Sequence, residues 1–292
     1  MLAADARDAD AVARIYAAKG RPSFNPLIVH VPDLAAAQAL AVFDKDALTL
    51  ATAFWPGPLT LVLPLRPGCG IAGLVTAGLD TIAIRVPAHR AIRALLAATG
   101  APLAAPSANA SNGISPTRAE HVAASLGGRV SLIVDDGACQ EGVESTIVAG
   151  RTLLRPGPVT LEMLGRVVPV TPGATTHVSA PGQLALHYAP SKPLRLAATS
   201  AQGDEWLIGF GPVAGDDSLS ASGDLTEAAA RLFDALHRAD AGGRARIAVA
   251  PVPDEGLGLA INDRLRRAAG ASGTADGAGA QGAAARPAGG AA

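Results

Sequence analysis

The chain has 292 residues, of which 49% are hydrophobic, and its formal net charge is −1 at pH 7. It is long and apolar enough for one large or two ordinary domains with buried cores, and its charge provides no global basic field for RNA. No apolar run approaches the roughly 18 residues of a membrane helix, and the acidic start does not resemble a signal peptide, so we expect a cytoplasmic protein. The two cysteines and six histidines show no metal-ligand spacing, so no metal site is predicted.

The first half of the chain alternates helical stripes with short apolar runs, the pattern of an α/β domain. An amphipathic stripe over residues 8–18 precedes Gly20, which can cap the end of a helix. Apolar runs typical of strands lie at residues 27–31, 59–65, 81–86, 102–105, 132–134 and 145–148. Helical stretches rich in Ala and Leu lie at residues 34–43, 46–54, 89–98 and 117–125. This pattern predicts one α/β domain over residues 1–166.

The composition changes after this domain. Residues 167–190 are rich in Pro, Gly, Thr and Ser, as in a linker or an ordered crossing segment. Residues 191–269 then alternate two strand patterns with two helix patterns and predict a smaller α/β domain, in which Gly209-Phe210-Gly211 is a poor dinucleotide fingerprint. Residues 270–292 are almost entirely Ala and Gly, too poor in large apolar groups to offset the entropy of ordering, and are predicted to be disordered.

The segment from Lys19 to His30 leaves the first helix and enters a buried strand. It brings two cations, Lys19 and Arg21, to the mouth of a strand together with Asn25 and His30. Ligand clefts often form at such strand ends. The planar fork of arginine and the compact charge of lysine suit a substrate with several anionic oxygens. Taken alone, the motif is weak, and a solvated surface pair is the favoured interpretation.

A second motif follows the predicted strand at residues 102–105. Ser107 and Asn109 are two residues apart, so in an extended segment they point to the same side. Ser115 and Thr117 precede a predicted helix, and capping is the expected role of each. Glu144 stands at the polar start of another strand, where a buried carboxylate needs a structural partner.

The order of these segments resembles one family. The succession KGRPSFNPLIVHV, FWPGPLTLVLP, TIAIRVP, APSANASNGISPT, GVESTIV and LLRPG is similar to that of the YrdC-like threonylcarbamoyl-AMP synthases. The later APGQLALHYAP resembles the linker of this family's longer form, and the stretches GDLTEAAARLFDALHRAD and PDEGLGLAINDRLRRAA resemble its C-terminal domain. The resemblance spans about residues 2–268. It implies a twisted YrdC-like α/β domain with a basic cavity, followed by a linker and a smaller Rossmann-like α/β domain.

The resemblance also implies a reaction and a site. L-threonine, bicarbonate and ATP, with Mg²⁺ bound through the ATP, would form threonylcarbamoyl-AMP and pyrophosphate, and a partner transferase complex would pass the threonylcarbamoyl group to tRNA. The residues implied as the central set are Lys19, Arg21, Ser107 and Asn109. The positions implied to contact ATP are Arg21, Asn25, Thr81, Ser107, Ser115, Arg155 and Tyr188. Tyr188 is implied to close over the nucleotide, so residues 167–190 are expected to act as a linker and lid. Those implied around threonine are His30, Arg85, Ala105 and Ser145. Such a reaction needs positioning and preorganised positive donors, and no protein nucleophile.

The chain departs from the family at its start. Family members begin with a strand and a TETVYGL-type segment, whereas this chain opens with MLAADA and matches only the end of it. We therefore expect the first strand and one threonine contact to be missing. An alternative function is a non-catalytic RNA-binding module, or an inactive fragment, with at most weak tRNA contact. A carbamoyl-adenylate activity, as in hydrogenase maturation proteins, is a second alternative, but their acylphosphatase and zinc-binding segments are absent from this sequence.

Overall fold

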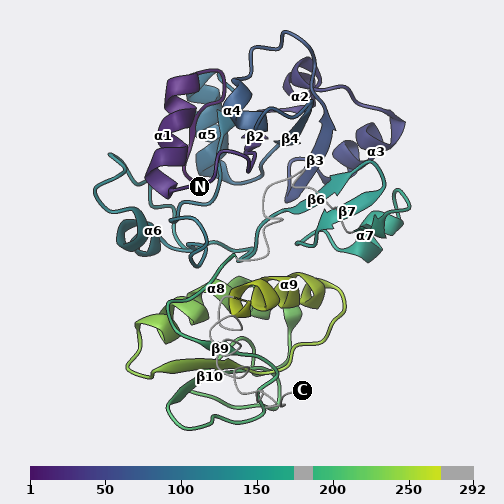
Figure 1. The fold of residues 1–292 in the computed structure, drawn as a ribbon. Helices are drawn as coiled ribbons and strands as arrows, with labels where there is room; N and C mark the ends of the chain where they lie inside the picture. The colour runs from purple at the N-terminus through teal and green to yellow at the C-terminus, as the bar shows by residue number, and fades with distance from the viewer. Residues whose placement is uncertain (174–186, 271–292) are drawn as a thin grey trace, which may run out of the picture.

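The computed structural model describes residues 1–173 and 187–270. The chain forms two α/β domains, of which the first carries an eight-stranded mixed sheet in the order β1-β5-β2-β4-β3-β6-β7-β8 (Figure 1). Its strands are β1 Ala4–Asp5, β2 Ile28–His30, β3 Leu59–Pro64, β4 Thr81–Arg85, β5 Leu103–Ala104, β6 Thr146–Ala149, β7 Thr152–Arg155 and β8 Thr171–Pro172. Its helices are α1 Ala9–Lys19, α2 Leu34–Leu40, α3 Lys45–Phe54, α4 Gly73–Thr76, α5 Arg90–Thr99, α6 Ala119–Leu126 and α7 Leu161–Gly165.

The first helix shows how local sequence sets an element. The carboxylate of Asp8 accepts a hydrogen bond from the backbone N–H of Ala11, which caps the start of α1. The helix ends at Gly20, whose φ of 59° lies in the left-handed region that glycine adopts without strain. The chain can therefore turn sharply after Lys19 and place Arg21 beside the end of the same helix.

The two faces of the first sheet differ in character. Val29, Leu61 and Ile84 belong to the main hydrophobic core together with side chains of α1, α2 and α3. Their sequence neighbours point to the opposite face because side chains alternate along a strand. There, a small separate cluster contains Ile28, Val62, Ala83, Ile147 and Leu154. One face is thus covered by the helices of the core. The second face carries this small apolar patch and, at β5, Leu103 packed against Ile92 and Leu96 of α5, and the rest of it is available for polar side chains.

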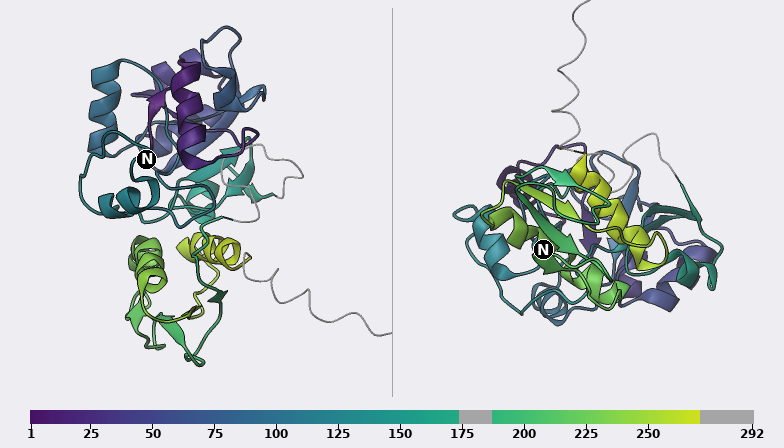
Figure 2. Two further views of the ribbon diagram at one scale, coloured as in Figure 1. Left: turned by 60° about the vertical axis from the view of Figure 1, so that its left-hand side comes forward. Right: turned by 90° about the horizontal axis from the view of Figure 1, so that it is seen from below.

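The second domain contains a four-stranded parallel sheet in the order β11-β10-β12-β9. Its elements are β9 Leu194–Arg195, β10 Glu205–Gly209, β11 Asp217–Ser218, α8 Leu225–Ala241, β12 Arg246–Val249 and α9 Leu257–Ala269. Figures 1 and 2 show α8 and α9 on the side of this sheet that faces the first domain. Any contact of the second domain with the first therefore depends mainly on these two helices.

The two domains touch directly. Ile114 and Val143 of the first domain belong to the same hydrophobic cluster as Leu232 and Phe233 of α8. A Cβ added to Gly142 would lie 2.0 Å from the backbone oxygen of Ala229, so only glycine permits this close approach. Because the first domain contributes side chains to the core of the second, the interface is part of the packed interior.

Most of the predicted elements are confirmed, and one is wrong. No strand forms at residues 132–134, where Leu132 and Val134 are 77% and 70% exposed. Strand propensity alone did not suffice there, because a short apolar run becomes a strand only when a neighbouring strand offers hydrogen bonds and a packing surface. Elsewhere, each other predicted run and helical stretch contains or overlaps a strand or helix.

The predicted linker, C-terminal tail and N-terminus can be compared with the observed elements. β8 lies at the edge of the first sheet, inside the stretch predicted as a linker. The predicted disordered tail lies outside the described residues except for Gly270. At the N-terminus, β1 pairs with β5 as a two-residue edge strand, and the expected lack of a first strand stays a prediction. Within the described part of the chain, no helix combines the length and hydropathy needed to cross a membrane.

Candidate functional site

The sheet face opposite the helix-covered core carries a row of polar side chains. His30 follows Ile28 by two residues and Arg85 follows Ala83 by two, so both share the face of the small apolar cluster. In the parallel pair of β2 and β4, His30 and Arg85 are direct register partners. Thr81 lies on the same face at the start of β4. Ala105 directly follows β5, and its backbone N–H donates a hydrogen bond to the carbonyl of Ile28. The sheet thus brings together residues implied for threonine and one implied for ATP.

A second group of polar atoms lies at the start of β6. The hydroxyl of Ser145 is 2.8 Å from the hydroxyl of Thr60 on β3. Arg155 of β7 donates from Nε to the carbonyl of Ser145 at 3.0 Å and from Nη2 to its hydroxyl at 3.1 Å. Arg155, Ser145 and Thr60 are 4%, 4% and 0% exposed. These contacts hold a guanidinium in a fixed position next to two hydroxyl groups.

His30 has an unused hydrogen-bonding atom. The residue is 1% exposed, and within the described residues its Nδ1 has no hydrogen-bond partner. Burial, with the nearby charge of Arg85 as a second cause, lowers the pKa of His30 to about 3, so the ring is neutral at physiological pH. Buried polar atoms are rarely left without a partner. The orphaned nitrogen beside a guanidinium therefore points to a polar ligand at this place.

Lys19 joins the end of α1 to the segment that contains Ser107 and Asn109. Its Nζ donates to the carbonyl of Ser107 at 2.6 Å and to the carbonyl of Asn109 at 2.5 Å, and lies 3.4 Å from Asn109 Oδ1. The residue is 3% exposed, so the alternative of a solvated surface pair is wrong for Lys19. Burial, followed by the neighbouring charge of Arg21, lowers the pKa of Lys19 to about 7.

Arg21 is held by the loop that leads into β2. It donates from Nε to the carbonyl of Asn25 at 3.1 Å, and from Nη2 to Asn25 Oδ1 and to the carbonyl of Pro26, both at 2.7 Å. Tyr16 donates its hydroxyl to the same Asn25 carbonyl at 2.9 Å. The loop therefore fixes the position of the Arg21 guanidinium before any ligand binds.

Four cations share this region. Burial is the first cause that lowers the pKa of Arg21 and of Arg85 to about 10 in each case, and the charge of Arg155 adds to both effects. Burial also lowers the pKa of Arg155. Burial and the charge of Arg21 likewise lower the pKa of Lys19. Positive groups that are withdrawn from water and repel one another are stabilised when an anion binds among them. The arrangement suits a ligand with several negative charges.

Glu144 is the carboxylate within this positive cluster. It accepts a hydrogen bond from the hydroxyl of Ser115 at 2.5 Å, and its other oxygen lies 3.0 Å from Nε of Arg264, a residue of α9. Burial by itself would raise the pKa of Glu144. The charges of Arg264 and Arg155, with the Ser115 hydrogen bond, outweigh burial and lower this pKa to about 2. Glu144 is therefore ionised throughout the physiological pH range.

The contacts of Ser115 and Thr117 correct the expected helix cap. The N-cap of α6 is Arg118, and no side chain caps this helix. Ser115 instead contacts Glu144, while the backbone N–H of Thr117 donates to Nδ1 of His121 at 3.2 Å. The cap prediction was wrong because the hydroxyl of Ser115 has a tertiary partner in Glu144, while Thr117 contacts the His121 ring within α6 and caps no backbone N–H of the helix.

Tyr188, which is implied to close over the nucleotide, lies buried between the domains. Its ring centroid is 5.4 Å from that of Phe233 and 5.6 Å from the guanidinium carbon of Arg264. The residue is fully buried, yet its hydroxyl has no hydrogen-bond partner in the described parts of the chain. Its backbone φ of 66° is unusual for a tyrosine. A contact between Tyr188 and nucleotide stays a prediction.

Two residues of this site, Thr60 and Arg264, were not predicted from the sequence. Thr60 had a signal, because it is the one polar side chain in the otherwise apolar strand LTLVLP. Arg264 had a stronger one, because it stands on the same helical stripe as Ile261, Leu265 and Ala268, which are all buried. A charged residue on an apolar stripe indicates a buried partner, but its identity depends on which domain surface the helix meets.

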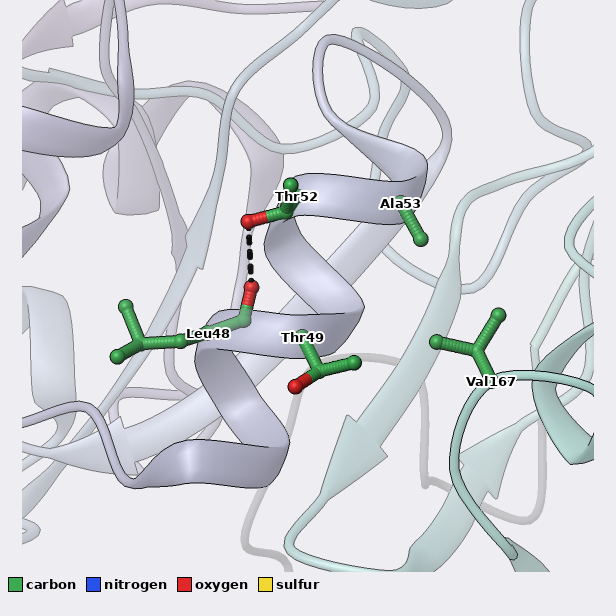
Figure 3. Close-up of a pocket in the computed structure, with 5 residues that line it drawn as sticks. All are labelled: Leu48, Thr49, Thr52, Ala53 and Val167. Carbon is green, nitrogen blue, oxygen red and sulfur yellow. Dashed lines mark hydrogen bonds between the residues drawn. The ribbon is translucent and has the colours of Figure 1, made fainter.

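A surface pocket elsewhere in the first domain does not have these properties. It lies between α3 and the segment after α7 and is lined by Leu48, Thr49, Thr52, Ala53 and Val167 (Figure 3). The hydroxyl of Thr52 is already used, since it donates to the carbonyl of Leu48 at 2.8 Å. With no ionisable side chain among its lining residues, this pocket offers little to a charged substrate.

Comparisons with known proteins agree on one family. The family model described as "Telomere recombination", which covers Sua5, YciO and YrdC, matches residues 1–157. The model described as "Threonylcarbamoyl-AMP synthase, C-terminal domain" matches residues 159–270. A Bacillus subtilis protein named threonylcarbamoyl-AMP synthase is 41% identical over 92% of this chain and 86% of its own length. One of the same name from Pyrococcus abyssi is 38% identical over 92% and 87%.

A solved structure shows the same arrangement. The crystal structure of P. abyssi Sua5 complexed with L-threonine superposes with a TM-score of 0.85 at 36% identity. The match covers 92% of this chain and 87% of that one. Both domains are therefore shared with a protein that has been crystallised with L-threonine.

Proposed function

Because this chain belongs to the threonylcarbamoyl-AMP synthase family in its two-domain form, we propose that it makes threonylcarbamoyl-AMP and pyrophosphate from L-threonine, bicarbonate and ATP. The observation that carries this proposal is the group of four cations, Lys19, Arg21, Arg85 and Arg155, beside the orphaned nitrogen of His30. A triphosphate and an amino acid carboxylate together supply the negative charges that such a group accepts.

The reaction has two stages in this proposal. The amine of threonine adds to bicarbonate and releases water, which gives an N-carboxylate. An oxygen of that carboxylate attacks the α-phosphate of ATP, and the bond to the β-phosphate breaks to release pyrophosphate. Arg85 binds the threonine carboxylate and His30 faces the same substrate, while Arg21 and Arg155 stabilise the negative charge on phosphate. The protein thereby contributes orientation and fixed positive charge.

The role proposed for Lys19 follows from its hydrogen bonds. Its ammonium group donates hydrogen bonds to the carbonyls of Ser107 and Asn109. Lys19 therefore keeps the Ser-x-Asn segment in place. Its charge acts on phosphate from this fixed position. A cation that is already oriented needs no reorganisation when charge develops during the reaction.

The cluster does not fit a metal ion held by the protein. Its side chains are mainly cations, and both carboxylate oxygens of Glu144 are occupied by Ser115 and Arg264. In the described residues, no group of three His, Cys, Asp or Glu side chains is placed to hold a metal. In our proposal Mg²⁺ is part of the ATP substrate and is held by phosphate oxygens.

We place the protein in the cytoplasm, where a transferase complex would use its product to modify tRNA. A non-catalytic RNA-binding role is less favoured by the burial of Lys19 and Arg155, because contacts to RNA phosphates require side chains at the surface.

The purified protein should release pyrophosphate from ATP only when both threonine and bicarbonate are present. Each substrate is needed because the attacking oxygen exists only after the amine has combined with bicarbonate. The measurement is pyrophosphate release together with detection of threonylcarbamoyl-AMP by mass spectrometry. Equal release without bicarbonate, or with glycine in place of threonine, would refute the substrate assignment.

ATP binding at pH 8 should take up a sizeable fraction of one proton per site. Burial and Arg21 lower the pKa of Lys19 to about 7, so this side chain is mostly neutral at pH 8 in the free protein. Bound triphosphate, whose own ionisation is complete at this pH, favours the charged form and raises that pKa. The affinity for ATP should therefore fall as the pH rises above 7. Calorimetry in Hepes and Tris buffers measures the uptake. The variant Lys19→Arg stays charged and should show none; equal uptake by this variant would assign the proton to another group.

A further inference from the structure

Arg264 connects the C-terminal domain to the substrate site of the first domain. It lies on α9, is fully buried, and donates from Nε to Glu144 Oε2 at 3.0 Å. Its Nη1 donates to the carbonyl of Pro156 at 2.7 Å and to Asp263 Oδ2 at 2.9 Å. Its Nη2 lies 3.3 Å from the backbone oxygen of Glu144. Three of the four contacts cross from one domain to the other, so this guanidinium is a cross-domain clamp on residues 144 and 156.

The clamped carboxylate occupies a sensitive position. Glu144 accepts a hydrogen bond from the hydroxyl of Ser115. It immediately precedes Ser145, to which Arg155 donates two hydrogen bonds. Its charge acts on Lys19 and on Arg155. A carboxylate in this place opposes the binding of any polyanion unless another group cancels its charge. Among the described residues, Arg264 is the cation that forms an ion pair with it.

We propose that Arg264 is a positioning residue for the nucleotide site: it cancels the charge of Glu144 and holds this carboxylate on Ser115, so that the cluster of Lys19, Arg21 and Arg155 stays net positive toward ATP. The C-terminal domain thereby completes a site that lies in the first domain. This inference rests on the proposed function, because it assumes that the anion bound by the cluster is the triphosphate.

A purely structural role makes a different prediction. If Arg264 only supports the domain interface, its loss should lower stability and should not be corrected by a change at Glu144. If it cancels a charge, removing the opposite charge should restore ATP binding even though the clamp is gone. The chain offers a matched control in Arg266, which lies on the same helix, is 59% exposed at its side chain, and is 3.8 Å from Asp254.

The test compares full-length Arg264→Met, the double variant Arg264→Met with Glu144→Gln, and Arg266→Met. Methionine keeps much of the buried volume without a charge. The measurements are the KM values for ATP and threonine, kcat, and the melting temperature. We expect Arg264→Met to raise the KM for ATP by about tenfold to a hundredfold, the size expected for one uncompensated charge several ångströms from the ligand. The KM for threonine should change by less than about threefold, and the double variant should recover most of the ATP affinity.

The outcomes separate the two proposals. If the wild-type protein makes no threonylcarbamoyl-AMP, the proposed function fails. If it does, and Arg264→Met has the same KM for ATP as Arg266→Met, the role of Arg264 is refuted. The same holds if the double variant binds ATP no better than Arg264→Met. Should Arg264→Met not fold, the double variant decides: a folded protein with ATP affinity near that of the wild type supports charge compensation, and an unfolded one overturns it.

Discussion

Replacing Lys19 by alanine should lower the turnover of threonylcarbamoyl-AMP synthesis by about a hundredfold or more, the order expected for the loss of one preorganised electrostatic donor. The substitution removes the positive charge beside Arg21 and frees the Ser107 and Asn109 carbonyls from their common donor. The Ser-x-Asn segment then loses the contact that fixes it to α1. Steady-state kinetics with saturating threonine and bicarbonate gives the turnover directly.

The same variant should also be less stable than the wild type. A side chain that is 3% exposed and makes two strong hydrogen bonds is part of the interior, so its loss should lower the melting temperature. Leaving two carbonyls without a donor costs about 1–3 kcal/mol, and relief from burying a charge offsets part of this. The control is Lys45→Ala, because Lys45 is exposed at the start of α3. Equal turnover in the two variants would show that Lys19 has no part in the reaction.

Replacing Arg85 by alanine should raise the KM for threonine by about a hundredfold, which corresponds to the 2–5 kcal/mol lost when one partner of a buried charge pair is removed. Arg85 lies beside His30 on the polar face of the sheet and donates from Nε to the carbonyl of Gly57 at 2.8 Å. One edge of its guanidinium is thus fixed, which leaves the rest for the threonine carboxylate that we propose it binds. The KM for ATP should change much less, since Arg21 and Arg155 remain.

The control for this variant is Arg93→Ala, because Arg93 is exposed on α5 and has no place in the cluster. Arg85→Lys should keep part of the threonine affinity, since it preserves the charge and loses the planar fork. A rise in the KM for ATP without any change for threonine would move Arg85 from the threonine part of the site to the nucleotide part.

Local sequence determined most of the secondary structure of this protein. Apolar periodicity, the cap at Asp8 and the turn at Gly20 suffice for α1, because these signals act between residues close together in the chain. The order of the motifs indicated the family, since many segments with a fixed succession seldom coincide by chance. The resemblance also implied His30, Arg85, Ala105 and Thr81 as site residues, and the alternation of side chains along β2, β4 and β5 places them on one face of the sheet.

Tertiary structure decided the properties that depend on distant neighbours. Lys19 could have been a solvated lysine until the fold placed the carbonyls of Ser107 and Asn109 around it. Residues 132–134 have the composition of a strand but pair with no strand in the described part of the chain. Ser115 has the character of a helix cap, yet its hydroxyl donates a hydrogen bond to Glu144. Arg264 contacts the same carboxylate although it lies 120 positions away in the sequence. Burial, charge compensation and hydrogen-bond partners arise from contacts between remote segments, and no pattern within a single segment can specify them.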